Sequence, residues 1–207
     1  MRKTLLIICF FCAQHMGAQE VLTQEEEQAF KQEVIQNAKE TQTIVSDFVQ
    51  YKHLSFLNND IETKGKLVFM APSKIKWEYT DPYEYSAIFK EDKLYINDGG
   101  NKTNIDIGSN KMFKSFNKLI VNSIKGDMFD ENEFSISYFK TTEGYLVRFV
   151  PKDKTIHEYI SSFELTFIKG IADVSEVRMI EPSEDYTRIV FENKKLNTTV
   201  SNAVFDH

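Results

Sequence analysis

Residues 65–85, GKLVFMAPSKIKWEYTDPYEY, form the most regular pattern in the chain. Apolar side chains at positions 67 and 69 alternate with their neighbours, and Ile75, Trp77 and Tyr79 then alternate with charged residues. A period of two puts these apolar side chains on one face of each strand. Between the two runs Pro72 restricts its own φ angle and has no N–H to donate, which favours a turn. The stretch therefore predicts a β-hairpin with one apolar, aromatic face.

The composition is that of a globular protein, with 207 residues of which 42% are hydrophobic and 27% are charged. One domain is the default at this length. The formal net charge is −6. An acidic chain is a poor ligand for nucleic acid or for anionic membrane surfaces, so we expect neither as a partner.

The first eighteen residues have the pattern of an export signal. A basic start at Arg2 and Lys3 precedes an apolar run over residues 5–11, and Gly17-Ala18 offers a small-residue cleavage point. The run is too short to span a bilayer. We therefore expect residues 1–18 to be a signal peptide, residues 19–207 to be the mature domain, and the protein to reside in the periplasm of a Gram-negative envelope. Cleavage would remove both cysteines, which excludes a disulfide or a thiol nucleophile in the mature chain.

Two segments have helical spacing. Thr23 and Glu26 form a capping-box pattern, and apolar residues follow at helical intervals, so we predict a helix over residues 24–45. Apolar residues three and four apart predict a second helix over residues 109–124. Short alternating runs separated by turn residues occupy most of the remaining chain, including Asp98-Gly99-Gly100-Asn101 as a hairpin turn and a last strand over residues 198–204.

These elements predict an α+β fold built on a single curved antiparallel β-sheet. A sheet of about ten strands curls or splits, and helices placed early and in the middle of the chain can cover its concave face. The result would be an incomplete, half-open barrel with helices as a lid over the apolar concave face. The inward face would be rich in aromatic side chains, because the chain contains 17 Phe, 9 Tyr and 1 Trp.

Several segments together resemble one family. They are, in chain order, Phe48-Val49-Gln50, Gly65 to Phe69, Pro72 to Tyr79, Pro82, Asp185-Tyr186-Thr187 and Asn197. In this order they are similar to the periplasmic outer-membrane lipoprotein carriers, the LolA-like family. The resemblance implies a chaperone that shields the acyl chains of lipoproteins in a hydrophobic cavity. It implies an inner-membrane exporter and an outer-membrane acceptor as partners, and we expect a monomer.

The resemblance and the periodicity together predict the side chains of the site. The predicted lipid-binding cavity consists of Leu67, Phe69, Ile75, Trp77, Tyr79, Phe149, Phe163 and Phe167. The predicted lid-helix contacts are Phe113, Phe116 and Ile120. Each of these side chains also fits simple core packing, and that alternative stays open. The family places an arginine that latches the lid just before the hairpin proline, whereas this chain has Ala71.

An enzymatic function finds little support in the sequence. The chain has no G-x-S-x-G motif, and His53, His157 and His207 are not at metal-ligand spacing from one another. We therefore expect no catalytic residues, no metal and no cofactor. Alternatives to a lipoprotein carrier are an envelope-stress sensor that binds lipoproteins with the same fold, a glycolipid or fatty-acyl carrier, and a lipid-modifying enzyme.

Overall fold

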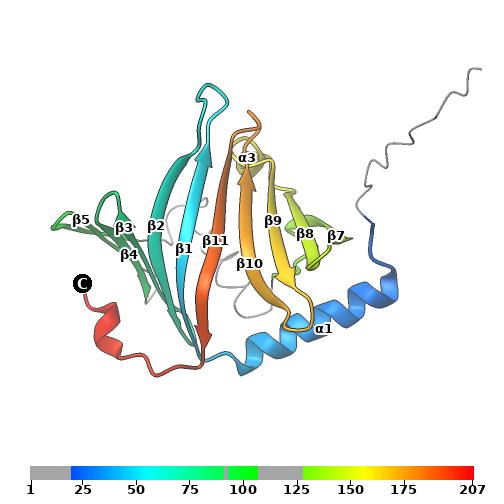
Figure 1. The fold of residues 1–207 in the computed structure, drawn as a ribbon, viewed down its shortest axis with the longest axis horizontal. Helices are drawn as coiled ribbons and strands as arrows, with labels where there is room; N and C mark the ends of the chain where they lie inside the picture. Colours follow the sequence, from blue (N-terminus) through cyan, green and yellow to red (C-terminus); the bar gives the residue numbers. More distant parts are fainter. Residues whose placement is uncertain (1–19, 91–92, 107–127) are drawn as a thin grey trace, which may run out of the picture.

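The computed structural model describes residues 20–90, 93–106 and 128–207, which form one open antiparallel sheet partly covered by helix α1 (Figure 1). The first six strands are β1 (Thr43–His53), β2 (Ile61–Met70), β3 (Lys74–Asp81), β4 (Tyr85–Lys90), β5 (Lys93–Asp98) and β6 (Asn101–Asp106). The other five are β7 (Phe134–Lys140), β8 (Gly144–Pro151), β9 (Ser162–Ile168), β10 (Asp173–Ile180) and β11 (Tyr186–Leu196). The helices are α1 (Gln24–Glu40), α3 (Lys154–His157) and the 3-10 turn η2 (Asn202–Phe205).

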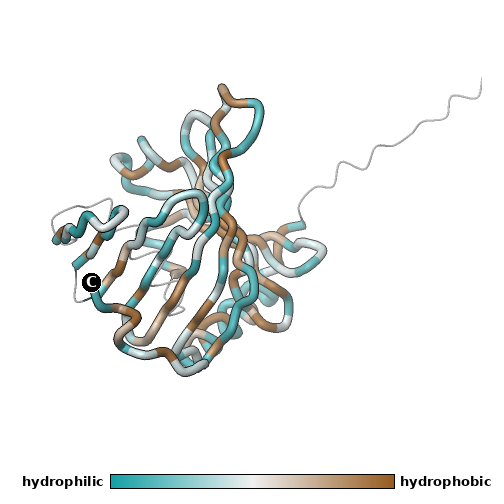
Figure 2. Tube along the Cα trace, turned by 60° about the vertical axis from the view of Figure 1, so that its left-hand side comes forward, coloured by the Kyte–Doolittle hydropathy of each residue, from teal (hydrophilic) through white to brown (hydrophobic). Residues whose placement is uncertain are grey.

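The strand order is β6-β5-β4-β3-β2-β1-β11-β10-β9-β8-β7. The first and last strands of this order remain edges, so the sheet curves without closing into a barrel, and the predicted α+β half-barrel is confirmed. Hydrophobic and hydrophilic residues alternate along the strands (Figure 2). The predicted signal peptide and the predicted second helix, with Phe113, Phe116 and Ile120, lie outside the described residues.

The hairpin predicted from residues 65–85 is formed by β2 and β3. Leu67 pairs with Trp77, and Phe69 pairs with Ile75, so the apolar positions of both strands share one face. The turn over residues 71–73 falls at the predicted proline. The Gly99-Gly100 turn between β5 and β6 also forms as predicted, with φ angles of 53° and 97° that suit a type I′ turn.

Gly65 has a packing role in this hairpin. It lies opposite Phe48 of β1, and the Phe48 ring covers it. A Cβ atom at Gly65 would lie 2.2 Å from the carbonyl oxygen of Glu78 and 2.3 Å from Cζ of Phe48. The Phe48 ring in turn stacks on Trp77 at a centroid distance of 4.1 Å. Any side chain at position 65 therefore displaces the aromatic stack.

We expect Gly65→Ala to destabilise the protein, although the same change in an ordinary strand is stabilising. Overpacking of this kind lowers the free energy of unfolding by about 1–3 kcal/mol. Chemical denaturation measures the difference, with Lys66→Ala as the control because Lys66 is exposed at the neighbouring position. Equal stability of the two variants would contradict the packing role of Gly65.

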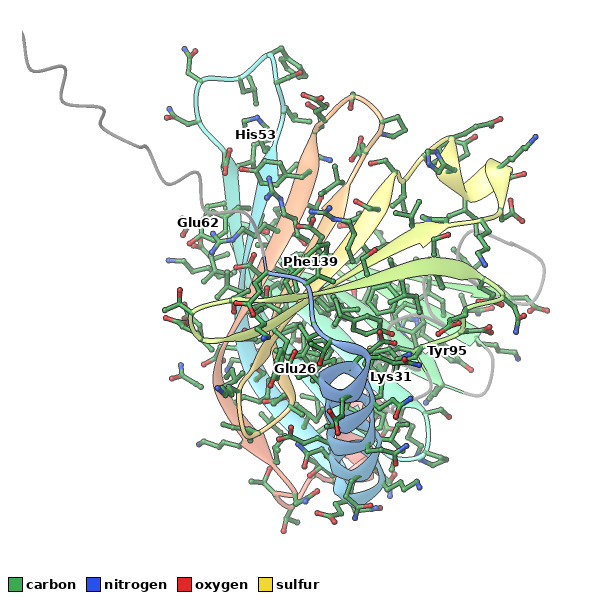
Figure 3. The ribbon with its side chains drawn as sticks, turned by 90° about the vertical axis from the view of Figure 1, so that its right-hand side faces the viewer. Glu26, Lys31, His53, Glu62, Tyr95 and Phe139 are labelled. Atoms are coloured by element: carbon green, nitrogen blue, oxygen red, sulfur yellow. The ribbon has the colours of Figure 1, made fainter. Side chains whose placement is uncertain are left out.

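Helix α1 begins at the predicted capping box. The Thr23 hydroxyl accepts from the Glu26 N–H at 3.3 Å, and the Glu26 carboxylate accepts from the Thr23 N–H at 2.9 Å. Glu26, labelled near the start of α1 in Figure 3, also lies 2.8 Å from Lys140 on β7. This ion pair ties the first turn to the sheet edge. The hydrogen bonds from Lys140 and from the Thr23 backbone lower the pKa of Glu26 to about 2. The first turn is therefore anchored by charge as well as by its cap.

Two predictions of secondary structure are wrong. The helix predicted to reach residue 45 ends at Glu40, and Val45 belongs to β1. Residues 41–45 are TQTIV, and their β-branched side chains favour an extended backbone. The strand predicted over residues 198–204 does not form either, because Asn197 takes a positive φ of 56° after β11 and the Ser201 hydroxyl then caps η2.

Within the described residues, no helix has both the length and the apolar character needed to cross a membrane.

Candidate functional site

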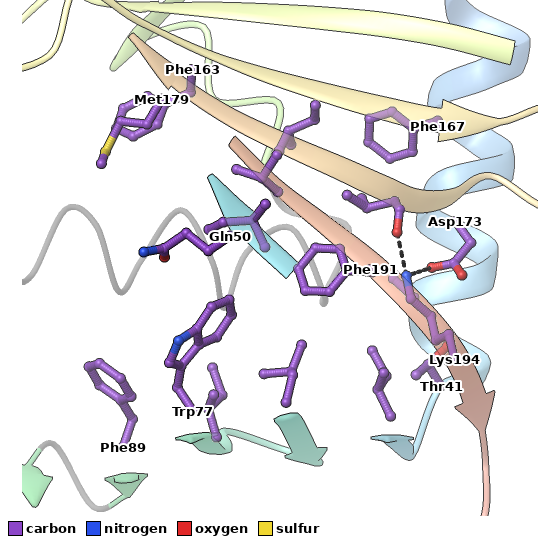
Figure 4. Close-up of a pocket in the computed structure, with 18 of the residues that line it drawn as sticks. Thr41, Gln50, Trp77, Phe89, Phe163, Phe167, Asp173, Met179, Phe191 and Lys194 are labelled. Carbon is purple, nitrogen blue, oxygen red and sulfur yellow. Dashed lines mark hydrogen bonds and ion pairs between the residues drawn. The ribbon is translucent and has the colours of Figure 1, made fainter. Parts of the chain in front are cut away.

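An apolar cavity of about 480 Å³ lies between the concave face of the sheet and α1 (Figure 4). Strands β1 to β5 contribute one wall, strands β9 to β11 contribute the other, and the second half of α1 closes one end. This volume falls in the range of small-molecule sites, which are concave and mostly apolar with a few polar groups. The curved sheet thus encloses a space that the described side chains leave unfilled.

Six of the eight predicted cavity residues line this space. They are Leu67, Ile75, Trp77, Tyr79, Phe163 and Phe167. The first four come from the β2–β3 hairpin and the other two from β9, so the structure brings together two segments that are far apart in sequence.

The other two predicted residues lie on the same face of the sheet as lining residues but are packed in the core beside the cavity. Phe69 is 2% exposed and belongs to a core cluster with Ile44 and Phe48. Phe149 is fully buried against Phe134, with ring centroids 5.9 Å apart. Neither lines the cavity, and both are core residues.

The wall also contains residues that the sequence reasoning did not single out. Val177 and Met179 of β10 face the cavity, as do Ile189 and Phe191 of β11. The sequence does indicate that Ile189 and Phe191 share one face of a strand, because they follow Thr187 with a period of two. Strands β10 and β11 therefore contribute more of the lining residues than the hairpin does.

Trp77 lies at the centre of an aromatic cluster. Phe48 stacks against one side of its ring, and Phe191 approaches edge-on at a centroid distance of 6.3 Å. Phe48 is buried beneath the indole on the same face of the sheet, while Trp77 itself is only partly buried and lines the cavity. One face of the indole therefore packs against Phe48, and another side of the ring borders the cavity.

The hairpin end of the cavity contains neutral polar groups. The Tyr79 hydroxyl donates to Oε1 of Gln50 at 2.9 Å. Burial raises the pKa of the Tyr79 phenol above its usual value, and burial together with Asp98 raises the pKa of Tyr85. Both phenols are therefore protonated at neutral pH and bring no charge into the cavity.

The α1 end of the cavity is tied together by hydrogen bonds. The Asn197 side chain donates to the Glu40 carbonyl at 3.1 Å and accepts from the Gln42 N–H at 2.7 Å. The Asn37 side chain donates to the carbonyl of Ile171 in the β9–β10 turn. These contacts hold the C-terminal end of α1 against two sheet segments, which closes this end of the cavity.

Among the described residues, no group of three or more His, Cys, Asp and Glu side chains could hold a metal ion. His53 lies 2.8 Å from Asp60 and stacks on Tyr186, away from the cavity lining. The described residues thus form an apolar cavity with polar groups at both ends.

The sequence profile described as "Outer membrane lipoprotein carrier protein LolA" matches residues 39–207. This chain belongs to the LolA family. The matched range starts near the end of α1 and contains all eleven strands of the sheet, so the cavity walls lie within it. The resemblance inferred from the hairpin is thereby confirmed.

Several solved structures share this fold at low sequence identity. An uncharacterized conserved protein from Thermus thermophilus has a TM-score of 0.53 and 9% identity, over 86% of this chain and 91% of its own. The MucA/MucB complex of Pseudomonas aeruginosa has a TM-score of 0.52 and 9% identity, over 86% of this chain and 60% of that one. The Mycobacterium tuberculosis lipoprotein LppX has a TM-score of 0.50 and 9% identity, over 89% of this chain and 100% of its own. A comparison with curated proteins found no match.

Proposed function

We propose that this LolA-family protein is a non-enzymatic periplasmic carrier that binds the acyl chains of lipoproteins or related lipids in the cavity between the sheet and α1. The observation that carries the proposal is the apolar cavity of about 480 Å³, walled mainly by aliphatic and aromatic side chains. An acyl chain in water costs about 0.8 kcal/mol per exposed methylene, so a carrier must offer such a surface.

The proposed cycle takes cargo from an inner-membrane exporter and delivers it to an outer-membrane acceptor. Delivery requires an affinity that is adequate without being extreme, because tight complexes dissociate slowly. A curved sheet whose strands do not close into a barrel suits this requirement better than a closed barrel would. An envelope-stress sensor would use the same cavity, but it would hold a signalling partner in a stable complex. Pull-down from envelope extracts separates these two functions.

The sole tryptophan reports directly on the proposed site. A chain entering the cavity should change the surroundings of the Trp77 indole, which faces it. We expect Trp77 emission to shift on titration of residues 19–207 with a diacyl lipopeptide or a long-chain fatty acid, and to saturate near one ligand per chain. Calorimetry provides the independent isotherm.

The two readouts give distinct outcomes. Binding by calorimetry with constant Trp77 emission would place the ligand outside the described cavity. No binding by either method would refute the carrier function. Saturation in both at the same ligand concentration is the expected result.

A substitution at position 71 tests whether the absence of the family's latching arginine affects cargo release. The Ala71 N–H donates to the Gln42 carbonyl at 2.8 Å, just after the C-terminal end of α1. An arginine here would be attracted to the negative end of the helix dipole. We expect Ala71→Arg to slow cargo release about two- to fivefold with little change in melting temperature. Stopped-flow Trp77 emission measures release, and Ala71→Met controls for side-chain length. Unchanged release rates would show that the departure at this position has no functional effect.

A further inference from the structure

A β-bulge in β11 turns Lys194 into the cavity. Val45 of β1 pairs with Lys195, but Asp47 pairs with Glu192, so β11 contains one extra residue. Asn193 accommodates it with a positive φ of 50°. The inward positions of β11 are therefore Ile189 and Phe191 and then Lys194, whereas an uninterrupted period of two would have continued to Asn193.

A second bulge lies beside the first, in β10. Val174 pairs with Phe167 of β9, but Glu176 pairs with Thr166, so Ser175 is the extra residue. Asp173 and Val174 both line the cavity, on the far side of this bulge from Val177. Bulges re-aim side chains and are common beside functional sites. Here two of them bring an acid and a base to the same end of an apolar cavity.

Asp173 and Lys194 form an ion pair at that end (Figure 4). Lys194 Nζ lies 2.8 Å from Asp173 Oδ1 and also donates to the Val174 carbonyl. The Lys194 side chain is 15% exposed and that of Asp173 is 24% exposed. Strands β10 and β11 are paired only from Glu176 to Ile180 and from Tyr186 to Val190, so the ion pair bridges the segment where they separate.

Stability alone does not account for these two charges. Transfer of two ions into a cavity wall has a desolvation cost that their attraction often only offsets, and apolar replacements of similar size are often neutral or stabilising. The pair also has unused hydrogen-bonding capacity. The ammonium donates to two oxygen atoms and lies 5.1 Å from the centroid of the Phe191 ring, which leaves one of its three protons without an oxygen acceptor, and the carboxylate has further lone pairs. The Thr41 hydroxyl at the same end donates to the Asn37 carbonyl and keeps its own lone pairs.

We propose that Asp173 and Lys194 form a head-group subsite that selects amphiphiles with a zwitterionic head. An ammonium group of the ligand would meet the Asp173 carboxylate, and an acidic oxygen of the ligand would meet the Lys194 ammonium. A head with a single negative charge would face Asp173 without compensation, and a purely cationic head would face Lys194. This inference rests on the proposed function, because it assigns a head group to the chain that the cavity holds.

Two lysophospholipids with the same acyl chain test the subsite. Lysophosphatidylethanolamine has a zwitterionic head with an ammonium group, and lysophosphatidylglycerol has an anionic head. Calorimetry below their critical micelle concentrations should show about tenfold tighter binding of the first to residues 19–207, a ratio that one charge-assisted hydrogen bond can supply. The double variant Asp173→Leu/Lys194→Met should bind both probes with equal affinity. Asp173→Asn should reverse the preference, because Lys194 would then face the anionic head alone.

The control is a second ion pair on the same two strands. Arg188 and Glu176 lie 2.9 Å apart and do not line the cavity, so Glu176→Leu/Arg188→Met should keep the wild-type preference. Binding of both probes by the wild type without preference, or a preference that survives in both Asp173 variants, would overturn the subsite and leave the carrier function standing. Failure of the wild type to bind either probe would overturn both.

Discussion

Replacing Phe30 by alanine is expected to lower the free energy of unfolding by about 3–5 kcal/mol, the range for loss of a buried phenylalanine. Phe30 is 2% exposed and packs in the core cluster that joins α1 to the sheet. Its ring centroid lies 4.8 Å from that of Tyr145 on β8 and 5.0 Å from that of Phe167 on β9. Few other side chains of α1 can compensate, because Phe30 and Val34 are its only fully buried residues among those described.

The measurement is chemical denaturation, with Gln28→Ala as the control on the exposed side of α1. An exposed helical position should change stability by no more than about 0.5 kcal/mol. Since α1 also closes one end of the cavity, Phe30→Ala should weaken lipid binding in parallel. A loss of stability below about 1 kcal/mol would mean that α1 is attached to the sheet mainly by its capping box and charges.

The hairpin could be predicted because its signals are local. The alternation around Trp77 and the turn at Pro72 depend on residues within one strand length, and the register Leu67–Trp77 follows from matching the two apolar faces. The same holds for the Gly99-Gly100 turn, where two positive φ angles suit glycine. Together with the other alternating runs and the two segments of helical spacing, these elements predict an open curved sheet.

The division between core and cavity could not be predicted in the same way. Phe69 and Leu67 have the same alternation, yet only Leu67 lines the cavity. Which of the two side chains borders the cavity depends on its distance from α1 and from the opposite wall. Residues far away in the sequence form both of these. Phe149 is similar, because its surroundings include Phe129 and Phe134 rather than the cavity.

The polar end of the site could not be predicted from a period of two either. Counting alternately from Ile189 and Phe191 leads to Asn193, and the structure places Lys194 inward instead. The only local hint is Asn193 itself, since asparagine tolerates a positive φ better than most residues. One inserted residue reverses the orientation of every side chain that follows it, so a bulge missed in the sequence changes the predicted chemistry of the wall.

A carboxylate placed in the cavity wall should abolish lipid binding while leaving the fold intact. Ile189 lines the cavity and is only partly buried, so Ile189→Glu can remain hydrated in the empty protein. An acyl chain would have to remove that water and leave the charge without a partner, which is costly in an apolar site. We expect the affinity for a long-chain fatty acid or lipopeptide to fall about 100-fold or more, equivalent to about 2.7 kcal/mol.

Val190→Glu is the matched control, because it introduces the same charge at the adjacent residue of β11, which does not line the cavity. The two variants share net charge and position in the strand and differ in the face that carries the carboxylate. Calorimetry at about pH 8 keeps the glutamate ionised, and thermal melts establish that both variants are folded. Wild-type affinity in Ile189→Glu, or an equal loss in both variants, would mean that the acyl chain does not contact this wall. A loss confined to Ile189→Glu would assign the chain to the space between β11, Trp77 and α1, with the head-group subsite at Lys194 just beyond it along β11.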